Sequence, residues 1–439
     1  MSSRHRALAP LGLSVLIGIF GCGVRPTPAS APPGAQASAS AGGTTGGETN
    51  DDAPAPRRTT PQALVAPTSA ELDAVRPLLA RGPVFMVRNA DAGADARITL
   101  VTRGRAPASA IHRAIITPGE YTTFMPILRD VELLSEHGNR KAFRFHVAAP
   151  LFDVTALCAM NVISERRVDV AITQSETGPG GSRWDLHPDG DETVVSLTTW
   201  GDPSQGHWLL RQVARRSPAA IAGMNISVDT VLGLGTVRRA EILSGRPLPM
   251  RPEQGIGPTG ELAPPAPGAW QSLTRDATLV STGLTPDGAV TQVTVAAWTS
   301  ADPEAVLTRL RDVTRYPSVW GSIRSVDVIA NAPDAPAGSV RYHVHIETPL
   351  ARIDGEQVMR TSGNTVWQDG VGGDLAGSSH RWDVLADPQG GSFVMLTGGA
   401  DYNRAGWITR ALMVRDPWLM AGFAGSWKIV WLRHLLRAL

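Results

Sequence analysis

The chain has 439 residues, more than one ordinary core of about 150 residues uses, so its length predicts two or three domains. Basic residues number 41 and acidic residues 40, and a formal net charge of +1 argues against a strongly basic nucleic-acid-binding protein. The only cysteines, Cys22 and Cys158, cannot build a disulfide framework or a thiolate zinc cage within one chain. The folded parts must therefore be stabilised by apolar cores.

The first 22 residues are typical of a targeting signal. Residues 4–6 (Arg-His-Arg) are basic, residues 8–20 are apolar, and Gly21 and Cys22 follow directly. The apolar stretch is too short for a comfortable transmembrane helix. It resembles a bacterial lipoprotein signal peptide, in which the chain is cleaved before the cysteine and the new N-terminus is acylated. There are two alternatives. The segment is an ordinary secretion signal and the cysteine is incidental, or the segment is retained as a membrane anchor.

An acylated Cys22 would hold the protein on a membrane almost permanently, because each buried methylene contributes about 0.8 kcal/mol. The next residue is Gly23 rather than the aspartate often linked to inner-membrane retention of lipoproteins. The resemblance therefore implies a lipid-anchored protein of the cell envelope, at the outer membrane and facing the periplasm.

Two segments of low complexity divide the rest of the chain. Residues 23–69 have no aromatic residue and almost no branched apolar residue before Leu64, so they are expected to form a disordered tether. Residues 245–268 are rich in proline and glycine and are expected to form a linker. The remaining residues, 70–244 and 269–439, are predicted to be two domains.

An internal repeat relates the two predicted domains. The tripeptide Arg-Trp-Asp at residues 183–185 recurs 198 residues later, at 381–383. Other matching pairs, such as Tyr121 with Tyr316, have offsets between 195 and 199 over the whole half. So constant an offset indicates a duplicated domain, and one half can be used to interpret the other.

Both halves have the same expected order of elements. Each begins with a strand, continues with a helix and a short helix near a tyrosine, and then has five or six alternating strands and a long apolar helix. In the first half the first strand, the helix, the tyrosine and the last strand fall at residues 97–103, 106–116, 121 and 192–200. In the second half they fall at residues 290–298, 303–313, 316 and 391–399. The last helix carries apolar residues at i, i+4, i+7, i+8 and i+12 from Phe423 to Leu435, which is one face of an α-helix.

Residues 300–320 (SADPEAVLTRLRDVTRYPSVW) resemble the opening of START-like domains of the polyketide cyclase and lipid-transport (SRPBCC) superfamily. Residues 106–112 and 121–126 match it more loosely in the first half. The resemblance covers nearly all of both halves, but it is a fold signature that does not fix a reaction. It implies an α+β fold of two tandem helix-grip domains, each a curved antiparallel sheet wrapped around a long C-terminal helix.

In a helix-grip domain the ligand is expected to lie between the concave sheet and the final helix. The residues expected to line this space are Phe143, Phe145, Trp184, Tyr342, Val344, Trp382, Met395, Phe423 and Trp427. Nine of the twelve tryptophans lie in the second half, from Trp270 to Trp431. They are expected to fill the core or to line a wide pocket. Alternatively, the last helix would present Trp418 and Trp431, with Lys428 and Arg433, to a membrane surface.

Other candidate sites have simpler explanations. The Arg-Trp-Asp repeat predicts an inward indole with an outward cross-strand pair. His343, His345 and Glu347 share one strand face, but the opposite face is apolar, so they are expected to be solvated rather than to bind a metal. Cys158 lies in an apolar strand and is expected to be a buried, inert thiol. No catalytic residue, metal or cofactor is predicted.

The function predicted from the sequence is non-catalytic binding or transport of a hydrophobic small molecule or lipid. The partners would be that ligand and the membrane, reached through acylated Cys22, with no nucleic acid. An enzyme of the aromatase or cyclase type is the first alternative, although export argues against it because such enzymes belong with cytosolic synthases. An interaction scaffold with cavities filled by side chains is the second.

We expect the substitution Cys22→Ser to release the protein from membranes, because it removes the residue that would be acylated. The measurement is fractionation of cells together with the mass of the mature N-terminal peptide. Unchanged membrane retention and unchanged mass in the variant would contradict lipidation.

Overall fold

The computed structural model describes residues 64–89, 96–125, 127–148, 153–208, 210–211, 218–246, 262–284, 290–330, 336–347, 352–400 and 418–439. The predicted signal peptide with Cys22, the tether as far as residue 63 and residues 247–261 of the predicted linker lie outside these ranges.

The elements of the first half are α2 (Ser69–Leu79), β1 (Val84–Arg88), β2 (Arg97–Gly104), α3 (Ala108–Ile116), η2 (Pro118–Thr123), β3 (Leu128–His137), β4 (Arg140–Ala148), β5 (Asp153–Ser164), β6 (Arg167–Ser175), β7 (Gly180–Asp189), β8 (Glu192–Gly201), η3 (Pro203–Gln205), α5 (Pro218–Asp229), η4 (Thr230–Leu234) and α6 (Gly235–Leu243). Those of the second half are α7 (Trp270–Leu273), β9 (Ala277–Leu284), β10 (Val290–Thr299), α8 (Pro303–Arg311), η5 (Val313–Arg315), α9 (Tyr316–Val319), β11 (Ile323–Val328), β12 (Val340–Glu347), β13 (Arg352–Ser362), β14 (Thr365–Gly373), β15 (Ser378–Ala386), β16 (Ser392–Ala400) and α11 (Trp418–Arg437).

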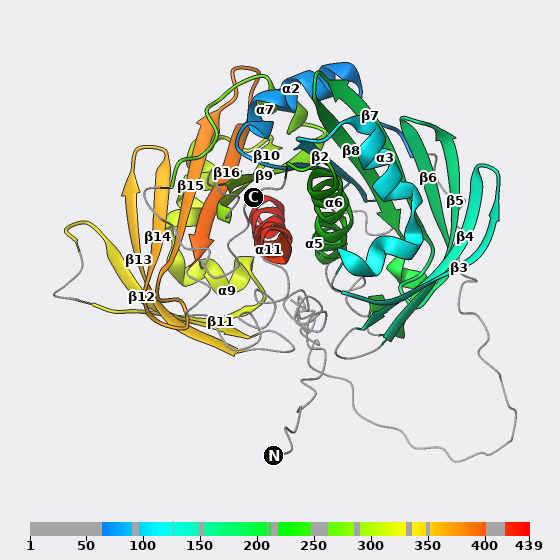
Figure 1. Cartoon of the computed structure of the whole chain (residues 1–439). Coiled ribbons are helices and arrows are strands. Elements are labelled where there is room, and N and C mark those ends of the chain that lie inside the picture. Colours follow the sequence, from blue (N-terminus) through cyan, green and yellow to red (C-terminus); the bar gives the residue numbers. More distant parts are fainter. Residues whose placement is uncertain are drawn as a thin grey trace, which may run out of the picture.

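All sixteen described strands belong to one antiparallel sheet that arches over the long helices (Figure 1). From the centre outwards, the first half runs β1-β2-β8-β7-β6-β5-β4-β3 and the second half runs β9-β10-β16-β15-β14-β13-β12-β11. The two orders are identical, and no described strand of one half lies among those of the other. The predicted duplication and the predicted α+β helix-grip architecture are confirmed.

The two halves meet at β1 and β9, which the sequence analysis did not predict. These strands pair antiparallel from Val84 opposite Ser281 to Arg88 opposite Ala277. Alternate residues of β1 are buried on opposite faces of the sheet. Phe85 faces the long helices, and Met86 faces the other side, where it belongs to a second apolar cluster on the outer face of the sheet (the outer cluster). The pairing removes the free edge that each half would otherwise expose at its centre.

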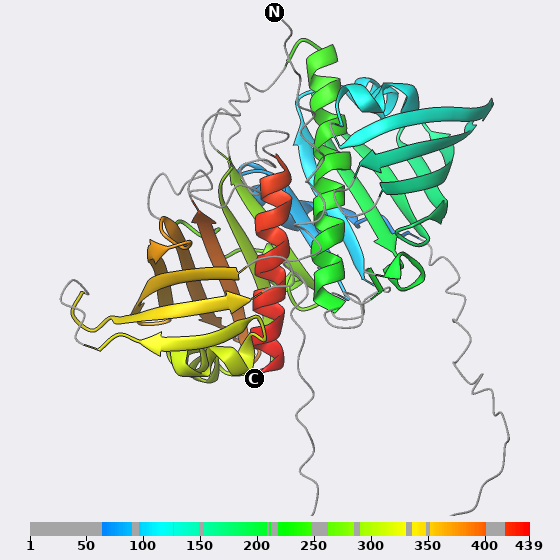
Figure 2. The same cartoon turned by 90° about the horizontal axis from the view of Figure 1, so that it is seen from below.

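The long helices of the two halves also pack against each other beneath the sheet (Figure 2). The hydroxyls of Ser227 in α5 and Ser426 in α11 lie 3.1 Å apart, and Ser426 also donates to the carbonyl of Gly223. A Cβ added at Gly422 would lie 2.9 Å from the Cα of Ser227, so glycine permits this close approach. The halves therefore share a core that continues from one to the other.

Burial on two sides explains the composition of the first long helix. Residues 219–243 form a helix of 25 residues whose most apolar 18-residue window has a mean hydropathy of 1.4. By length and composition it could cross a membrane, but 72% of that window is buried inside the protein. One side packs on the sheet and another on α11, so apolar and small residues occur all round. The sequence of this segment is that of a core helix.

The outer face of the central strands is covered by two short helices. Thr68 caps α2 in a capping box with Glu71, and Leu72, Val75 and Leu78 of this helix are buried against the sheet. Trp270 of α7 joins the same cluster from the second half. The central strands are thus buried on both faces, whereas the distal strands are covered on one.

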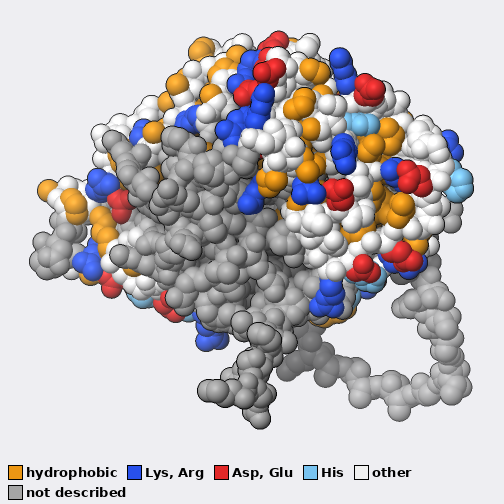
Figure 3. Space-filling model, in the orientation of Figure 1, with side chains coloured by type: hydrophobic (Ala, Val, Ile, Leu, Met, Phe, Trp, Pro, Cys, Tyr) orange, Lys and Arg blue, Asp and Glu red, His pale blue; other side chains and the backbone are white. Residues whose placement is uncertain are grey.

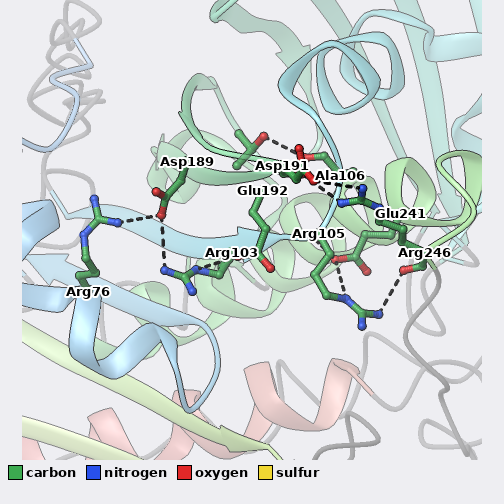
Figure 4. A network of polar contacts seen from close by, with 10 residues as sticks. Arg76, Arg103, Arg105, Ala106, Asp189, Asp191, Glu192, Glu241 and Arg246 are labelled. Atoms are coloured by element: carbon green, nitrogen blue, oxygen red, sulfur yellow. Dashed lines mark hydrogen bonds and ion pairs between the residues drawn. The ribbon is translucent and has the colours of Figure 1, made fainter.

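A polar network fixes the end of the first long helix to the sheet (Figure 4). Asp189 in the β7–β8 hairpin accepts hydrogen bonds from Arg76 of α2 at 2.9 Å and from Arg103 of β2 at 3.5 Å. Glu241 of α6 accepts one from the backbone amide of Arg105 at 2.8 Å.

Over the face drawn in Figure 3, basic and acidic side chains are interspersed, in agreement with the near-zero net charge.

We expect Gly422→Val to lower the free energy of unfolding by about 1–3 kcal/mol, because the new side chain must push the two helices apart. Gly119→Ala is the control, because a Cβ there meets nothing within 4 Å. The measurement is thermal or urea unfolding of both variants. Equal stability of the two variants would show that the helix contact is loose.

Candidate functional site between the sheet and the long helices

Most residues predicted to line the ligand space do lie between sheet and helix. Five of them are buried in the apolar cluster between the sheet and the long helices: Phe143, Trp184, Tyr342, Val344 and Trp382. Phe145 and Trp427 are partly buried and pack against this cluster. The side chain of Phe423 lies outside the described residues.

Met395 does not face the helix, and its prediction was wrong. In β16, Leu396 lies opposite Trp382 and Met395 lies opposite Asp383. Since neighbouring residues of a strand point to opposite faces, Met395 lies on the outer face, in the cluster that α2 and α7 cover. Trp382 and Met395 therefore cannot line the same space.

Aromatic side chains fill the interior of the second half. Tyr316, Trp320, Tyr342 and Trp382 are each at most 1% exposed. The ring of Trp320 stacks on that of Trp431 with centroids 5.2 Å apart, and its indole nitrogen donates to the carbonyl of Trp431 at 2.9 Å. Part of the tryptophan excess of the second half is thus used as core.

A buried hydrogen-bond network links these rings, and the sequence analysis missed its centre, Gln368. The side-chain amide of Gln368 donates to the Tyr316 hydroxyl at 2.7 Å and accepts from the Trp382 indole at 3.0 Å. The Tyr342 hydroxyl donates to Gln357 at 2.7 Å. Burial raises the pKa of both tyrosines, so their hydroxyls stay protonated donors. A polar residue at an inward position of a strand is the signal that would have identified Gln368.

Two ionisable groups of the second half are buried beside this network. Lys428 of α11 is 1% exposed and its Nζ lies 4.8 Å from the centre of the Trp427 ring. Burial lowers the pKa of Lys428 to about 7. Burial, with the charge of Lys428, lowers the pKa of His380 in β15 to about 3, so its imidazole is neutral. Both side chains adjoin Gly398, where an added Cβ would lie 2.6 Å from His380 Cδ2 and 3.0 Å from Lys428 Cε.

The same positions of the first half carry different groups. Asp229 of α5 corresponds to Lys428, and Thr199 of β8 corresponds to Gly398. The carboxylate of Asp229 is 1% exposed and accepts a hydrogen bond from Thr199 at 2.8 Å. Burial raises the pKa of Asp229 well above its usual range, although the bond from Thr199 acts in the opposite direction. The fold therefore places an acid and a base at equivalent buried sites.

The distal strands of the first half leave apolar inward side chains partly exposed. Phe145 is partly exposed, whereas Val344 at the same position of the second half is 1% exposed. Val147 is likewise partly exposed, whereas the equivalent Ile346 is buried. Because the backbone positions correspond, the difference lies in how much of the space the side chains fill.

The Arg-Trp-Asp repeat anchors the start of each half. Arg183 donates to the carbonyl of Leu64, and Arg381 donates to the carbonyl of Leu262 at 3.2 Å. The indoles point inward as predicted. The acids lie on the opposite face from the indoles, as predicted, but they are buried there rather than solvated, with Asp185 5% exposed and Asp383 6% exposed. Their charges are balanced within the sheet by arginines on the same face.

The histidine strand and Cys158 have local partners or surroundings that account for them. His345 and His343 both face Asp354, with nitrogen to oxygen distances of 2.5 and 3.6 Å, and Glu347 pairs with Arg324. Among the described residues there is no group of three His, Cys, Asp or Glu that could hold a metal ion. Cys158 is buried, and burial raises the pKa of its thiol to about 12.

Two other surfaces are less suited to be the site. The predicted membrane-facing surface of the last helix is not available as a whole, because Lys428 is buried and Trp431 stacks on Trp320. An open polar depression of about 460 Å³ lies at the β5–β6 hairpin. It is lined by Ile163, Ser164, Arg166, Arg167, Asp185, Leu186, His187 and Pro188. Most of its lining residues are polar or charged, which does not suit a hydrophobic ligand, and it lies outside the space between the sheet and the long helices.

Solved structures similar to this chain include single-domain and two-domain proteins. A protein from Thermus thermophilus is 16% identical, covers 34% of this chain and 99% of its own, and has a TM-score of 0.31. The di-domain ARO/CYC StfQ from the steffimycin biosynthetic pathway is 12% identical and has a TM-score of 0.26. The match covers 77% of this chain and 99% of StfQ. A STAR-related lipid transfer protein from Xanthomonas axonopodis is 16% identical, covers 37% and 98%, and has a TM-score of 0.26. No family model and no curated protein matches the chain.

The fold class follows from the strand order and from the position of the long helices. The chain consists of two tandem α+β helix-grip domains joined edge to edge.

We expect Lys428→Met to stabilise the protein at pH 6 and to have little effect near pH 10. Below pH 7 both the folded and the unfolded chain carry this charge, and the folded chain bears the full cost of burying it. Between pH 7 and 10.5 the unfolded chain binds more protons, so wild-type stability rises with pH by up to about 1.4 kcal/mol per unit from this group. The measurement is the Tm of both proteins across this range.

The matched control is Lys428→Arg, which keeps its charge at every pH and should destabilise the protein throughout. A difference between wild type and Lys428→Met that stays constant from pH 6 to pH 10 would contradict the cost of burying the ammonium.

Proposed function

We propose that the chain binds an apolar small molecule or lipid between the sheet and the long helix of its first half. The observation that carries this proposal is the partial exposure of inward apolar side chains at Phe145 and Val147, where the second half is closed. Leu128 and Ile172 of the neighbouring strands are also only partly buried against the core. An apolar face that the protein does not fill itself forgoes packing contacts, which a ligand would restore.

The scaffold alternative describes the second half better than the first. There the rings of Tyr316, Tyr342 and Trp382 fill the space around Gln368, and their polar atoms have partners among the described residues. These residues are accounted for as core. The cyclase alternative requires polar groups that face a bound substrate. In the first half the buried acid is Asp229, but it is 1% exposed and already accepts a hydrogen bond from Thr199, so simple binding is the more economical interpretation.

We further propose that the protein is exported and acylated at Cys22, with residues 23–69 as a flexible tether. The support is the sequence alone: basic residues, a short apolar stretch and a cysteine, followed by a segment that cannot fold. A tether of this kind would let the domains capture ligands away from the membrane surface while staying attached to it.

We expect Phe145→Gln to weaken binding of the uncharged fluorophore N-phenyl-1-naphthylamine by about fivefold or more, because a polar group replaces apolar contact area. Leu157→Gln is the matched control, since Leu157 lies on the adjacent strand and faces the other side of the sheet. The measurement is fluorescence titration, with mass spectrometry of lipid extracts from the purified protein.

Equal binding by the two variants, or a purified protein that takes up neither the fluorophore nor any apolar molecule, would overturn the proposal. The filled-scaffold alternative would then describe the first half.

A further inference from the structure

The choice of lysine at position 428 is unusual for this chain. Of its 41 basic residues only two are lysines, Lys141 and Lys428. Lys141 lies at the rim of the first half, where it donates to the carbonyl of Ile116 at 2.7 Å and pairs with Glu136 at 2.9 Å. Lys428 is the one placed in the interior. Arginine stays charged in any protein environment, whereas an amine can lose its proton when it is buried.

No described element packed on α11 offers Lys428 a free anion. The elements that pack most extensively on α11 are α5, η4, β9, β10 and β16. Their only charged residue is Asp229, and its carboxylate accepts from Thr199 of the first half. From β15 the titratable group is His380, which is neutral. Within the described part of the chain, Lys428 thus has the face of an indole as its partner instead of a carboxylate.

A second group beside it also lacks a partner. His380 is 5% exposed, and its Nδ1 has no hydrogen-bond partner within the described residues. A buried imidazole nitrogen left without a partner costs free energy, as does a buried amine without an anion. The first half shows that the fold requires neither group, because Ser182 and Asp229 take their places there.

We propose that Lys428 and His380 form a binding site for a small monocarboxylate. One negative charge matches one ammonium, and an imidazole in its Nδ1–H tautomer would donate a hydrogen bond to the same carboxylate. The hydrocarbon part would lie against Trp427 and Trp431, which are both partly exposed and lie 4.8 Å apart between ring centres. Trp427 lies over both polar groups, with its ring 5.2 Å from that of His380, so its side chain must shift for the ligand to enter.

The surrounding core limits the size of this ligand. Trp320 and Trp382 are at most 1% exposed, and Gly398 leaves no room for a Cβ. A long acyl chain does not fit beside them without unfolding part of the core. The site is therefore independent of the apolar site proposed for the first half, and it differs from it in ligand chemistry.

The experiment uses the scarcity of lysine as a probe. With lysine labelled by carbon-13, the spectrum of the protein has one set of signals from Lys428 and one from Lys141. Hexanoate is titrated in at pH 8, with hexan-1-ol as the uncharged match. We expect hexanoate, and not hexanol, to move the Lys428 Cε signal to that of a charged amine, because the carboxylate favours the protonated form.

The matched variants are Lys428→Met and Lys141→Met, compared by calorimetry. We expect Lys428→Met to weaken hexanoate binding by at least about tenfold, since it removes one partner of a buried charge pair. Lys141→Met should bind as the wild type does. Because Lys428→Met is expected to fold more stably than wild type, loss of binding in it is not loss of folding.

Three outcomes would overturn the proposal: equal binding of hexanoate and hexanol, an unmoved Lys428 signal at saturation, or undiminished hexanoate binding by Lys428→Met. The proposed apolar site is tested separately. Phe145→Gln should leave hexanoate binding unchanged, and Lys428→Met should leave naphthylamine binding unchanged, so either proposal can fail without the other.

Discussion

The edge-to-edge joint between the halves fixes the surroundings of both long helices. It has two parts, the pairing of β1 with β9 and the contact of α5 with α11 around Ser227 and Ser426. Together they place both long helices beneath one continuous sheet and against each other. A helix held in this way has little surface left for water, so even polar residues on it become buried. That is why Asp229 and Lys428 are desolvated, whereas a lone helix-grip domain would leave one side of its helix open.

Duplication with divergence explains how one backbone arrangement came to have two different interiors. Tyr121 and Tyr316 each donate their hydroxyl to the carbonyl six residues earlier, and the strand registers correspond. The inward side chains, however, differ. The second half has indoles and hydrogen-bonded amides that fill most of its interior, while the first half has partly exposed apolar side chains such as Phe145. The two halves thus differ in how completely their side chains, at equivalent backbone positions, fill the interior.

Polar chemistry has diverged in the same way. At equivalent positions the first half has a carboxyl supported by Thr199, and the second has an amine over Gly398 beside His380. Each is costly in a low-dielectric interior, and each costs more without a partner than with one. Such residues persist most readily where a ligand supplies what the protein lacks. In the two proposals made above, the halves are accordingly two sites of different chemistry on one frame.

The duplication, the order of elements and the class of fold could be predicted from the sequence, because a constant offset and the periods of strands and helices are properties of the chain alone. Phe143, Tyr342 and Trp382 were also placed correctly on the inward face. The strands β1 and β9 were missed, because their residues are buried on both faces and so show no alternation. Met395 was assigned to the wrong face, and Lys428 and Gln368 received no weight as buried polar groups. These points required the folded chain, because burial, pKa and pairing depend on which distant segments come together, and the joint between the halves is a contact that no local pattern encodes.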